Sequence, residues 1–175
     1  MAKKTDDEKT NVMRVLDQKK IAYRHYCYIH ETDENGEPVT NGVEVARLLG
    51  EDVRKVFKTL VTVGKTGQHY VFMIPVAEEL DLKKAARAAG EKSIEMLPVR
   101  DLTQVTGYVR GGCSPIGMKK AFPTYLEEAA LKQETVMVSG GRLGAQIALS
   151  PRDLAAACGG QFADITEKKE KEKTV

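Results

Sequence analysis

The feature that most constrains this chain is the glycine-rich segment at residues 107–120, which reads GYVRGGCSPIGMKK. The pair Gly111 and Gly112 lets the backbone approach another group closely because no Cβ atoms intervene, and Gly117 permits a positive φ. Pro115 stiffens the turn between them because its ring fixes φ. The pattern predicts an ordered loop that presents backbone amides to a ligand, although a tight turn in a closed sheet would use the same residues.

The segment does not have the residues of a nucleotide-binding P-loop. Gly112 and Gly117 are separated by four residues, as the two P-loop glycines are. However, Met118 stands where the phosphate-binding lysine is required, and Lys119 stands where Ser or Thr should follow. We therefore predict no Walker A nucleotide site.

The length and composition of the chain predict one folded domain. The chain has 175 residues, of which 42% are hydrophobic, which suffices for a single core. We expect this domain to span residues 10–166 and the charged segments 1–9 and 167–175 to be disordered, since neither has periodic apolar residues. No apolar run of about 18 residues is present, and no signal-peptide pattern begins the chain. We therefore expect a soluble cytoplasmic protein without a membrane partner.

Charge and cysteine content limit the possible partners and cofactors. The 27 basic and 25 acidic residues leave a net charge of only +2, so we expect local contacts with RNA and no DNA partner. The three cysteines and three histidines show no metal-ligand spacing. We predict no disulfide framework, no metal and no cofactor.

Helix and strand patterns alternate along the chain. Helices are predicted at 10–20, 41–49, 82–89, 98–107 and 150–158, and strands at 23–29, 57–63, 68–74, 93–96, 123–126, 134–138 and 162–165. The turn at 64–67 predicts an antiparallel hairpin. Such hairpins exclude a doubly wound parallel sheet, so the predicted fold class is α/β with a mixed, curled or barrel-like sheet flanked by helices.

Lys58 is unusual within the strand at 57–63. Strand alternation places it on one face between Val56 and Leu60, so an ammonium lies among aliphatic side chains. Burying an ammonium without a partner costs on the order of several kcal/mol, because an isolated charge loses its hydration. Lys58 must therefore extend outward, pair with a carboxylate or bind an anionic ligand.

A second glycine-rich turn, SGGRLG, occupies residues 139–144. It would place the Ser139 hydroxyl, bare amides and the Arg142 guanidinium beside the first loop. A hairpin with a bulge explains the same residues without a ligand.

Three segments together resemble the YbaK/EbsC family: VFKTLV at 56–61, the whole of 107–120, and VSGGR at 138–142. The resemblance extends over about residues 11–165. Members of this family resemble the editing domain inserted in bacterial prolyl-tRNA synthetases, and the type that this chain resembles is the Cys-tRNA(Pro) deacylase. The resemblance implies the YbaK editing-domain fold, the acceptor end of aminoacyl-tRNA as substrate, and prolyl-tRNA synthetase as a partner.

The resemblance also implies roles for individual residues. Lys58 matches the lysine that holds the phosphate of the terminal adenosine, and Gly111 matches the glycine whose amide faces the aminoacyl carbonyl. These two are the predicted catalytic residues. The predicted substrate-binding residues are Tyr28, Thr59, Gly112, Ser114, Ser139, Gly140 and Arg142.

Two positions depart from the family pattern. Asn41 falls where an aromatic residue is common, and Gln146 falls near a position that is often acidic. Since relatives edit alanine, serine, threonine or other small residues, the preferred amino acid is left open. A non-catalytic module that binds tRNA or a synthetase also remains as an alternative.

The expected chemistry depends on the substrate. The sequence shows no nucleophile and base pair near these loops; Cys113 is the obvious protein thiol, but no histidine neighbours it. In the deacylases that this chain resembles, the substrate cysteine attacks its own ester carbonyl and leaves as a thiolactone. We expect the amides around Gly111 and Gly112 to stabilise the developing oxyanion.

Overall fold

The protein, described by a computed structural model at residues 9–167, contains two β-sheets. The smaller sheet has the strand order β1 (Arg24–Cys27), β7 (Ala145–Leu149), β6 (Val136–Ser139). The larger has the order β4 (Ile94–Met96), β2 (Phe57–Gly64), β3 (His69–Pro75), β5 (Thr124–Glu127), β8 (Gly160–Ala163). Of the segments expected to be disordered, residues 1–8 and 168–175 lie outside the described residues.

The larger sheet is mixed, as the sequence predicts. Strand β3 pairs in parallel with β5, and β5 with β8, whereas β2 pairs antiparallel with both β3 and β4. A single parallel bridge between Val56 and Met137 joins the two sheets. The predicted α/β class with a mixed sheet is confirmed, but the strands of residues 9–167 form two sheets and no closed barrel.

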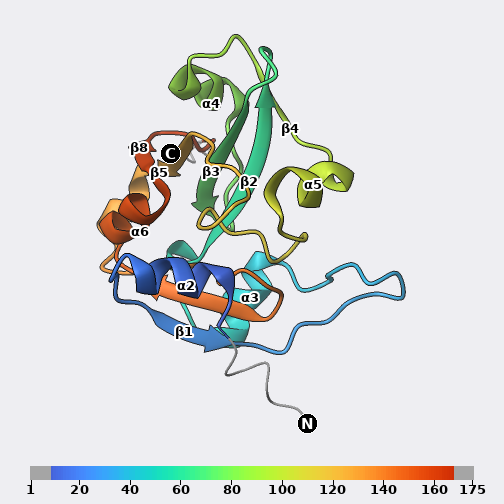
Figure 1. The fold of residues 1–175 in the computed structure, drawn as a ribbon, viewed down its shortest axis with the longest axis vertical. Coiled ribbons are helices and arrows are strands. Elements are labelled where there is room, and N and C mark those ends of the chain that lie inside the picture. The colour runs from blue at the N-terminus through green and yellow to red at the C-terminus, as the bar shows by residue number, and fades with distance from the viewer. Residues whose placement is uncertain (1–8, 168–175) are drawn as a thin grey trace, which may run out of the picture.

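Helices cover both faces of the smaller sheet (Figure 1). Helix α2 (Asn11–Gln18) packs its Leu16 with Val138 and Ile147, and helix α3 (Gly42–Leu49) packs its Ala46 against the opposite face, with Met137. The larger sheet is accompanied by α4 (Leu82–Ala89), α5 (Leu102–Thr106) and α6 (Pro151–Cys158). The smaller sheet is therefore the middle layer between two helices.

Helix α3 begins and ends where its sequence predicts. The Asn41 side chain accepts a hydrogen bond from the Glu44 N–H at 2.9 Å, and Gly50 has a φ of 68° at the other end. The helical spacing of Val45, Leu48 and Leu49 predicts one buried stripe, but this prediction is wrong for Leu48, which is 45% exposed. Val45 and Ala46 make the buried contact instead.

Three short 3-10 helices join the longer elements. The 3-10 helix η1 (Val53–Lys55) leads into β2, η2 (Val99–Asp101) leads into α5, and η3 (Glu128–Lys132) follows β5. Their positions at the strand ends set where the intervening loops leave the sheets.

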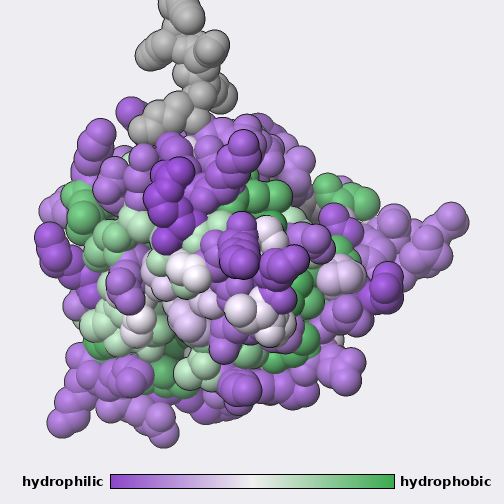
Figure 2. Space-filling view, turned by 90° about the horizontal axis from the view of Figure 1, so that it is seen from above, coloured by the Kyte–Doolittle hydropathy of each residue, from purple (hydrophilic) through white to green (hydrophobic). Residues whose placement is uncertain are grey.

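The surface is mainly hydrophilic on the face seen from above, where apolar side chains are scattered among polar ones (Figure 2). The loop that projects between β1 and α3 is exposed at its tip, residues 33–37. No helix within residues 9–167 is long and apolar enough to cross a membrane.

Candidate active site

A cavity of about 370 Å³ opens between the two sheets. Its lining comes from segments far apart in the chain: Tyr28, residues 38–42, Val45, residues 56–60, Val76, Arg110, Gly111, Cys113, Ser139 and Gln146. Five of the predicted site residues thus meet here, namely Tyr28, Lys58, Thr59, Gly111 and Ser139.

The two glycine-rich segments are packed against each other beside this cavity. A Cβ atom on Gly112 would lie 3.0 Å from backbone atoms of Arg142, so only glycine allows this approach. Gly111 has a φ of +86°, and a Cβ there would lie 2.6 Å from Leu143 Cδ2 and 3.1 Å from Pro38. The second glycine-rich turn therefore joins the antiparallel strands β6 and β7 and also supports the first loop.

The first loop is held in place from within and from helix α2. The Tyr108 hydroxyl donates to the Ile116 carbonyl at 2.5 Å, and the Asn11 side chain donates to the Gly117 carbonyl at 2.9 Å. The Lys119 ammonium donates to the Gln104 carbonyl at 3.0 Å. These bonds bridge the bend of the loop, so Gly111 is presented by an ordered backbone.

Lys58 brings a positive charge to the cavity without a partner for it. Its strand neighbours hold it in register opposite Ile74 on β3. Within residues 9–167, no carboxylate lies within salt-bridge distance of its ammonium. The sequence left three possibilities for Lys58, and the described residues exclude one of them, pairing with a carboxylate.

The amides of the glycine pair are not equivalent. The Gly112 N–H donates to the Val109 carbonyl at 3.0 Å, which closes a turn and removes this amide from the set of available donors. No acceptor among the described residues is hydrogen-bonded to the Gly111 N–H. Of the two amides expected to serve an oxyanion, only that of Gly111 therefore has no acceptor among the described residues.

Three of the predicted site residues bring hydroxyl groups to the cavity. Burial raises the pKa of Tyr28, although a hydrogen bond with the Gly144 backbone acts in the opposite direction. The Thr59 hydroxyl faces Met73 Sδ at 3.3 Å, and the Ser139 Oγ accepts the Gly141 N–H at 3.1 Å. Ser139 thus stabilises its own turn and is not activated by a base.

The other predicted site residues lie behind the lining. Ser114 is fully buried, and its Oγ accepts the Ile116 N–H at 3.3 Å, so it shapes the loop. Gly140 lies against Ala145 in the hairpin. Gly112, Gly140, Ser114 and Arg142 are not among the residues that line the cavity.

The sequence interpretation missed part of the lining. Residues 38–42 also line the cavity, with Pro38 directly beside Gly111, and Arg110 adds a second cation whose guanidinium is 3.9 Å from Glu37. Pro38 followed by the helix-capping Asn41 was a usable signal for a bent, fixed segment. Nothing in the local pattern said that the segment would face the glycine loop.

Gln146 has the most unusual environment of the lining residues. It is only 7% exposed, and its Oε1 is buried without a hydrogen-bond partner. It lies on β7 directly opposite Tyr26 of β1 and Ser139 of β6. A buried polar atom without a partner is rare and requires an explanation.

Cys113 is poorly suited to act as a nucleophile. Burial raises the pKa of its thiol to about 12, and it is 8% exposed. The attacking species in thiol chemistry is the thiolate. None of the described lining residues is a histidine, aspartate or glutamate, so no side chain there can act as its base.

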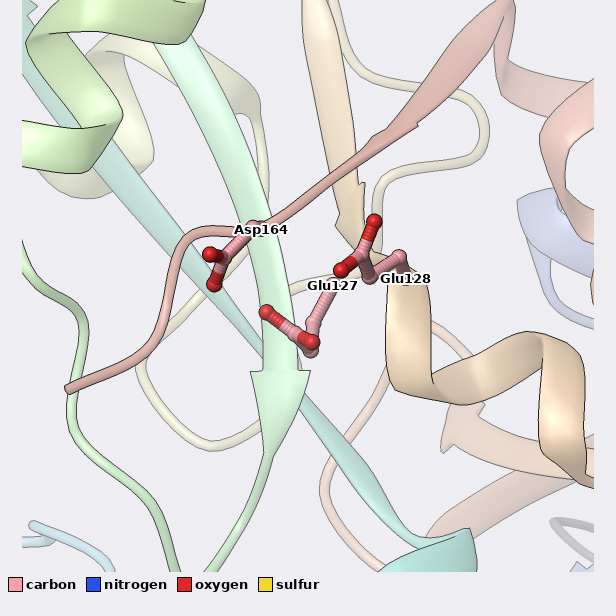
Figure 3. A group of neighbouring side chains, drawn as sticks. All are labelled: Glu127, Glu128 and Asp164. Atoms are coloured by element: carbon pink, nitrogen blue, oxygen red, sulfur yellow. The ribbon is translucent and has the colours of Figure 1, made fainter. Parts of the chain in front are cut away.

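An acidic cluster lies outside the cavity, where Glu127, Glu128 and Asp164 place carboxylate oxygens within 4.8 Å of one another (Figure 3). The Glu127 oxygens already accept the N–H groups of Ile165 at 2.9 Å and Ala129 at 3.1 Å. Asp164 is paired with the Lys84 ammonium at 3.0 Å. These contacts give the cluster a role in joining β5, β8 and α4.

Comparison with known proteins identifies the family. Residues 36–157 match the model of the aminoacyl-tRNA editing domain. The chain belongs to this family. The editing domain contains most of the cavity lining described above, and the resemblance to YbaK/EbsC inferred from the sequence is confirmed.

Individual relatives of the editing domain agree with this assignment. The chain is 48% identical over 168 residues to "Putative Cys-tRNA(Pro)/Cys-tRNA(Cys) deacylase EbsC" of Enterococcus faecalis, covering 96% of this chain and 99% of that protein. A solved "putative trans-editing enzyme for prolyl tRNA synthetase" matches with a TM-score of 0.74 and 28% identity, covering 90% of this chain and 96% of that one. "Hypothetical protein APE2540" matches with a TM-score of 0.78 and 25% identity, covering 90% and 99%.

Proposed function

We propose that this protein is a trans-editing deacylase that removes cysteine from mischarged Cys-tRNA(Pro). Family membership supplies the activity class, hydrolysis of an aminoacyl-tRNA ester. The observation that carries the proposal is the cavity that holds an unpaired Lys58 ammonium and a free Gly111 amide, with no base in its described lining. Such a site can hold and polarise an ester, but it does not supply a nucleophile.

Lys58 and Gly111 would act on different parts of the substrate. A lysine ammonium is a point charge suited to a phosphate, so Lys58 would hold the phosphate of the terminal adenosine. The Gly111 N–H would donate to the ester carbonyl oxygen as negative charge develops there. Together the two contacts would fix the scissile ester in the cavity.

The cysteine substrate would supply the attacking group. A thiol with a pKa of about 8.5 is a few per cent thiolate near neutral pH, whereas a serine hydroxyl needs a positioned base. The thiolate sulfur bonds to the carbonyl carbon, the carbon–oxygen bond to the ribose breaks, and the ribose oxygen takes a proton. The products are tRNA and a four-membered cysteine thiolactone.

The tRNA body would be recognised mainly through a partner. A net charge of +2 gives little attraction for a long phosphate backbone. The EbsC relative is named for both Cys-tRNA(Pro) and Cys-tRNA(Cys), in line with weak discrimination by the protein alone. We assign the selection of proline tRNA to prolyl-tRNA synthetase, which would also place the activity in the cytoplasm.

The decisive test is single-turnover deacylation of Cys-, Ser-, Ala- and Pro-charged proline tRNA, with analysis for thiolactone. We expect rapid cleavage of the cysteinyl ester and far slower cleavage of the seryl ester. Equal rates on the two would contradict thiol assistance, and preferred cleavage of Ala-tRNA would assign another substrate. Retention of intact aminoacyl-tRNA would show a binding module and no enzyme.

The role of a partner is tested with the same amino acid on two tRNAs. The isolated protein should cleave Cys-tRNA(Pro) and Cys-tRNA(Cys) at similar rates, and added prolyl-tRNA synthetase should favour the first. A strong preference by the protein alone would refute the inference from charge.

A further inference from the structure

Gln146 is the cavity residue whose environment the chemistry above does not explain. The residue is only 7% exposed, and its buried Oε1 atom accepts no hydrogen bond. Folding a carbonyl oxygen into this position without a donor is unfavourable. An acceptor kept in that state inside a binding cavity indicates a donor that arrives with the ligand.

Three other side-chain acceptors of the lining each accept a backbone N–H. Asn41 Oδ1 accepts the Glu44 N–H at 2.9 Å, and Thr40 Oγ1 accepts the Glu31 N–H at 3.2 Å. Ser139 Oγ, directly across the strand pair from Gln146, accepts the Gly141 N–H at 3.1 Å. Of these four side-chain acceptors, the Gln146 carboxamide oxygen is the one that is buried and accepts no hydrogen bond.

The charges of the lining indicate which donor group of a ligand would need an acceptor such as Gln146 Oε1. Lys58 and Arg110 are cationic, and no aspartate or glutamate is among the described lining residues. An aminoacyl ester carries an α-amino group two bonds from the carbonyl carbon that Gly111 faces in the proposed function. This group therefore enters the same cavity and needs a neutral acceptor there.

We infer that Gln146 is a positioning residue that accepts a hydrogen bond from the substrate's α-amino group. This inference rests on the proposed function and adds to it the group that orients the aminoacyl moiety. The terminal carboxamide torsion is broad, so a rotation brings the oxygen to the amine without backbone movement. Holding the amine and the carbonyl together fixes the direction in which the side-chain thiol points.

The test is a binding cycle that does not require turnover. Two stable ligands are used, 3′-amino-3′-deoxyadenosine acylated through an amide with cysteine or with 3-mercaptopropionate, which lacks only the α-amine. Wild-type protein should bind the cysteinyl ligand roughly tenfold more tightly by calorimetry, as a hydrogen bond to a charged donor predicts. The variant Gln146→Met, similar in size but without the acceptor, should bind the two ligands equally.

Controls separate a ligand role from a structural one. Gln133→Met, in the segment before β6, should keep the wild-type preference. Unfolding in urea should show Gln146→Met at least as stable as wild type, because the variant removes an unpartnered buried acceptor. A less stable variant that keeps the tenfold preference would overturn the inference.

Turnover of Cys-tRNA(Pro) distinguishes this inference from the proposed function. If wild-type protein shows the amine preference but cleaves no ester, the role of Gln146 stands and the deacylase proposal fails. If it cleaves the ester but Gln146→Met weakens both ligands equally, the deacylase stands and the role of Gln146 is wrong. Failure of wild type to bind either ligand would also overturn the role of Gln146.

Discussion

Glu127 and Gln146 are two polar side chains on buried strand positions, and they differ in whether their oxygens have partners. Glu127 is 5% exposed, and each carboxylate oxygen accepts at least one hydrogen bond, from Ala129 or from Ile165. Gln146 is 7% exposed, and its Oε1 accepts none. Glu127 and Gln146 are therefore similarly buried but differ in whether their oxygens accept hydrogen bonds.

We interpret the difference as one between a structural site and the proposed binding site. Around Glu127 the polar atoms satisfy one another, and the Lys84 ammonium balances Asp164. In the cavity the Lys58 ammonium and the Gly111 amide also lack partners among the described residues. Changes in the cavity should therefore affect activity more than stability, and changes at Glu127 the reverse.

The largest effect is expected for Gly111→Val. A Cβ at this position meets Leu143 at 2.6 Å, and the φ of +86° disfavours any side chain, so the amide would move away from the carbonyl. Loss of one oxyanion donor removes roughly 2.7–4 kcal/mol of transition-state stabilisation. Single-turnover deacylation of Cys-tRNA(Pro) should fall by roughly 100- to 1000-fold.

The matched control is Gly67→Val in the turn between β2 and β3. Gly67 has a φ of +92°, but no atom lies within 4 Å of an added Cβ. This variant shares the backbone strain without the crowding, so it should keep its activity. Equal losses in both variants would show that strain alone, and not the position of the amide, explains the effect.

Glu127→Ala should have the next largest effect, and on stability alone. The change leaves the part-buried Ala129 N–H and the buried Ile165 N–H without their acceptor, which should lower the free energy of unfolding by roughly 3 kcal/mol. Urea unfolding measures this value. The exposed neighbour gives the control Glu128→Ala, expected within about 0.5 kcal/mol of wild type. A folded Glu127→Ala protein that lost its activity would break the contrast between the two sites.

Lys58→Ala should reduce deacylation with little change in stability. A charge-assisted contact with phosphate contributes roughly 1.5–3 kcal/mol, which corresponds to about ten- to a hundredfold in kcat/KM. Lys65→Ala, in the turn beyond the same strand, is the control and should behave as wild type. Normal deacylation by folded Lys58→Ala protein would remove Lys58 from the proposed mechanism.

Cys113→Ala should have the smallest effect on activity, less than about threefold, because a protonated thiol has no part in the chemistry. Removing a small buried side chain should still cost about 1 kcal/mol of stability. The same kinetic assay, with mass spectrometry of the protein, checks this expectation. A cysteinyl adduct on Cys113 of the wild-type protein would identify it as a nucleophile.

The sequence predicted the local elements well because their signals are local. Asn41 and Gly50 bound helix α3, and the turn at 64–67 joins β2 to β3. Strand β7 was missed because it is buried along its whole length and contains two alanines, so it shows neither alternation nor strong strand propensity. Strand β8 begins at Gly160, two residues before its predicted start, because pairing with β5 outweighs the low strand propensity of glycine.

The site could be predicted only in part. Lys58 was detected because a charged residue on an otherwise apolar strand face conflicts with the pattern of its own strand. The engagement of the Gly112 amide by Val109, and the isolation of Gln146 Oε1, depend on distances between segments that no local pattern encodes. The structure, and not the sequence, therefore shows which groups of the cavity lack hydrogen-bond partners.

The high pKa of Cys113 has a consequence for the product of the proposed reaction. A thiolactone is an acylating agent, and a neighbouring protein thiolate would take its cysteinyl group and inactivate the enzyme. With a pKa of about 12, roughly one Cys113 thiol in a hundred thousand is ionised at pH 7. Burial of this thiol would protect the cavity from self-acylation by the thiolactone.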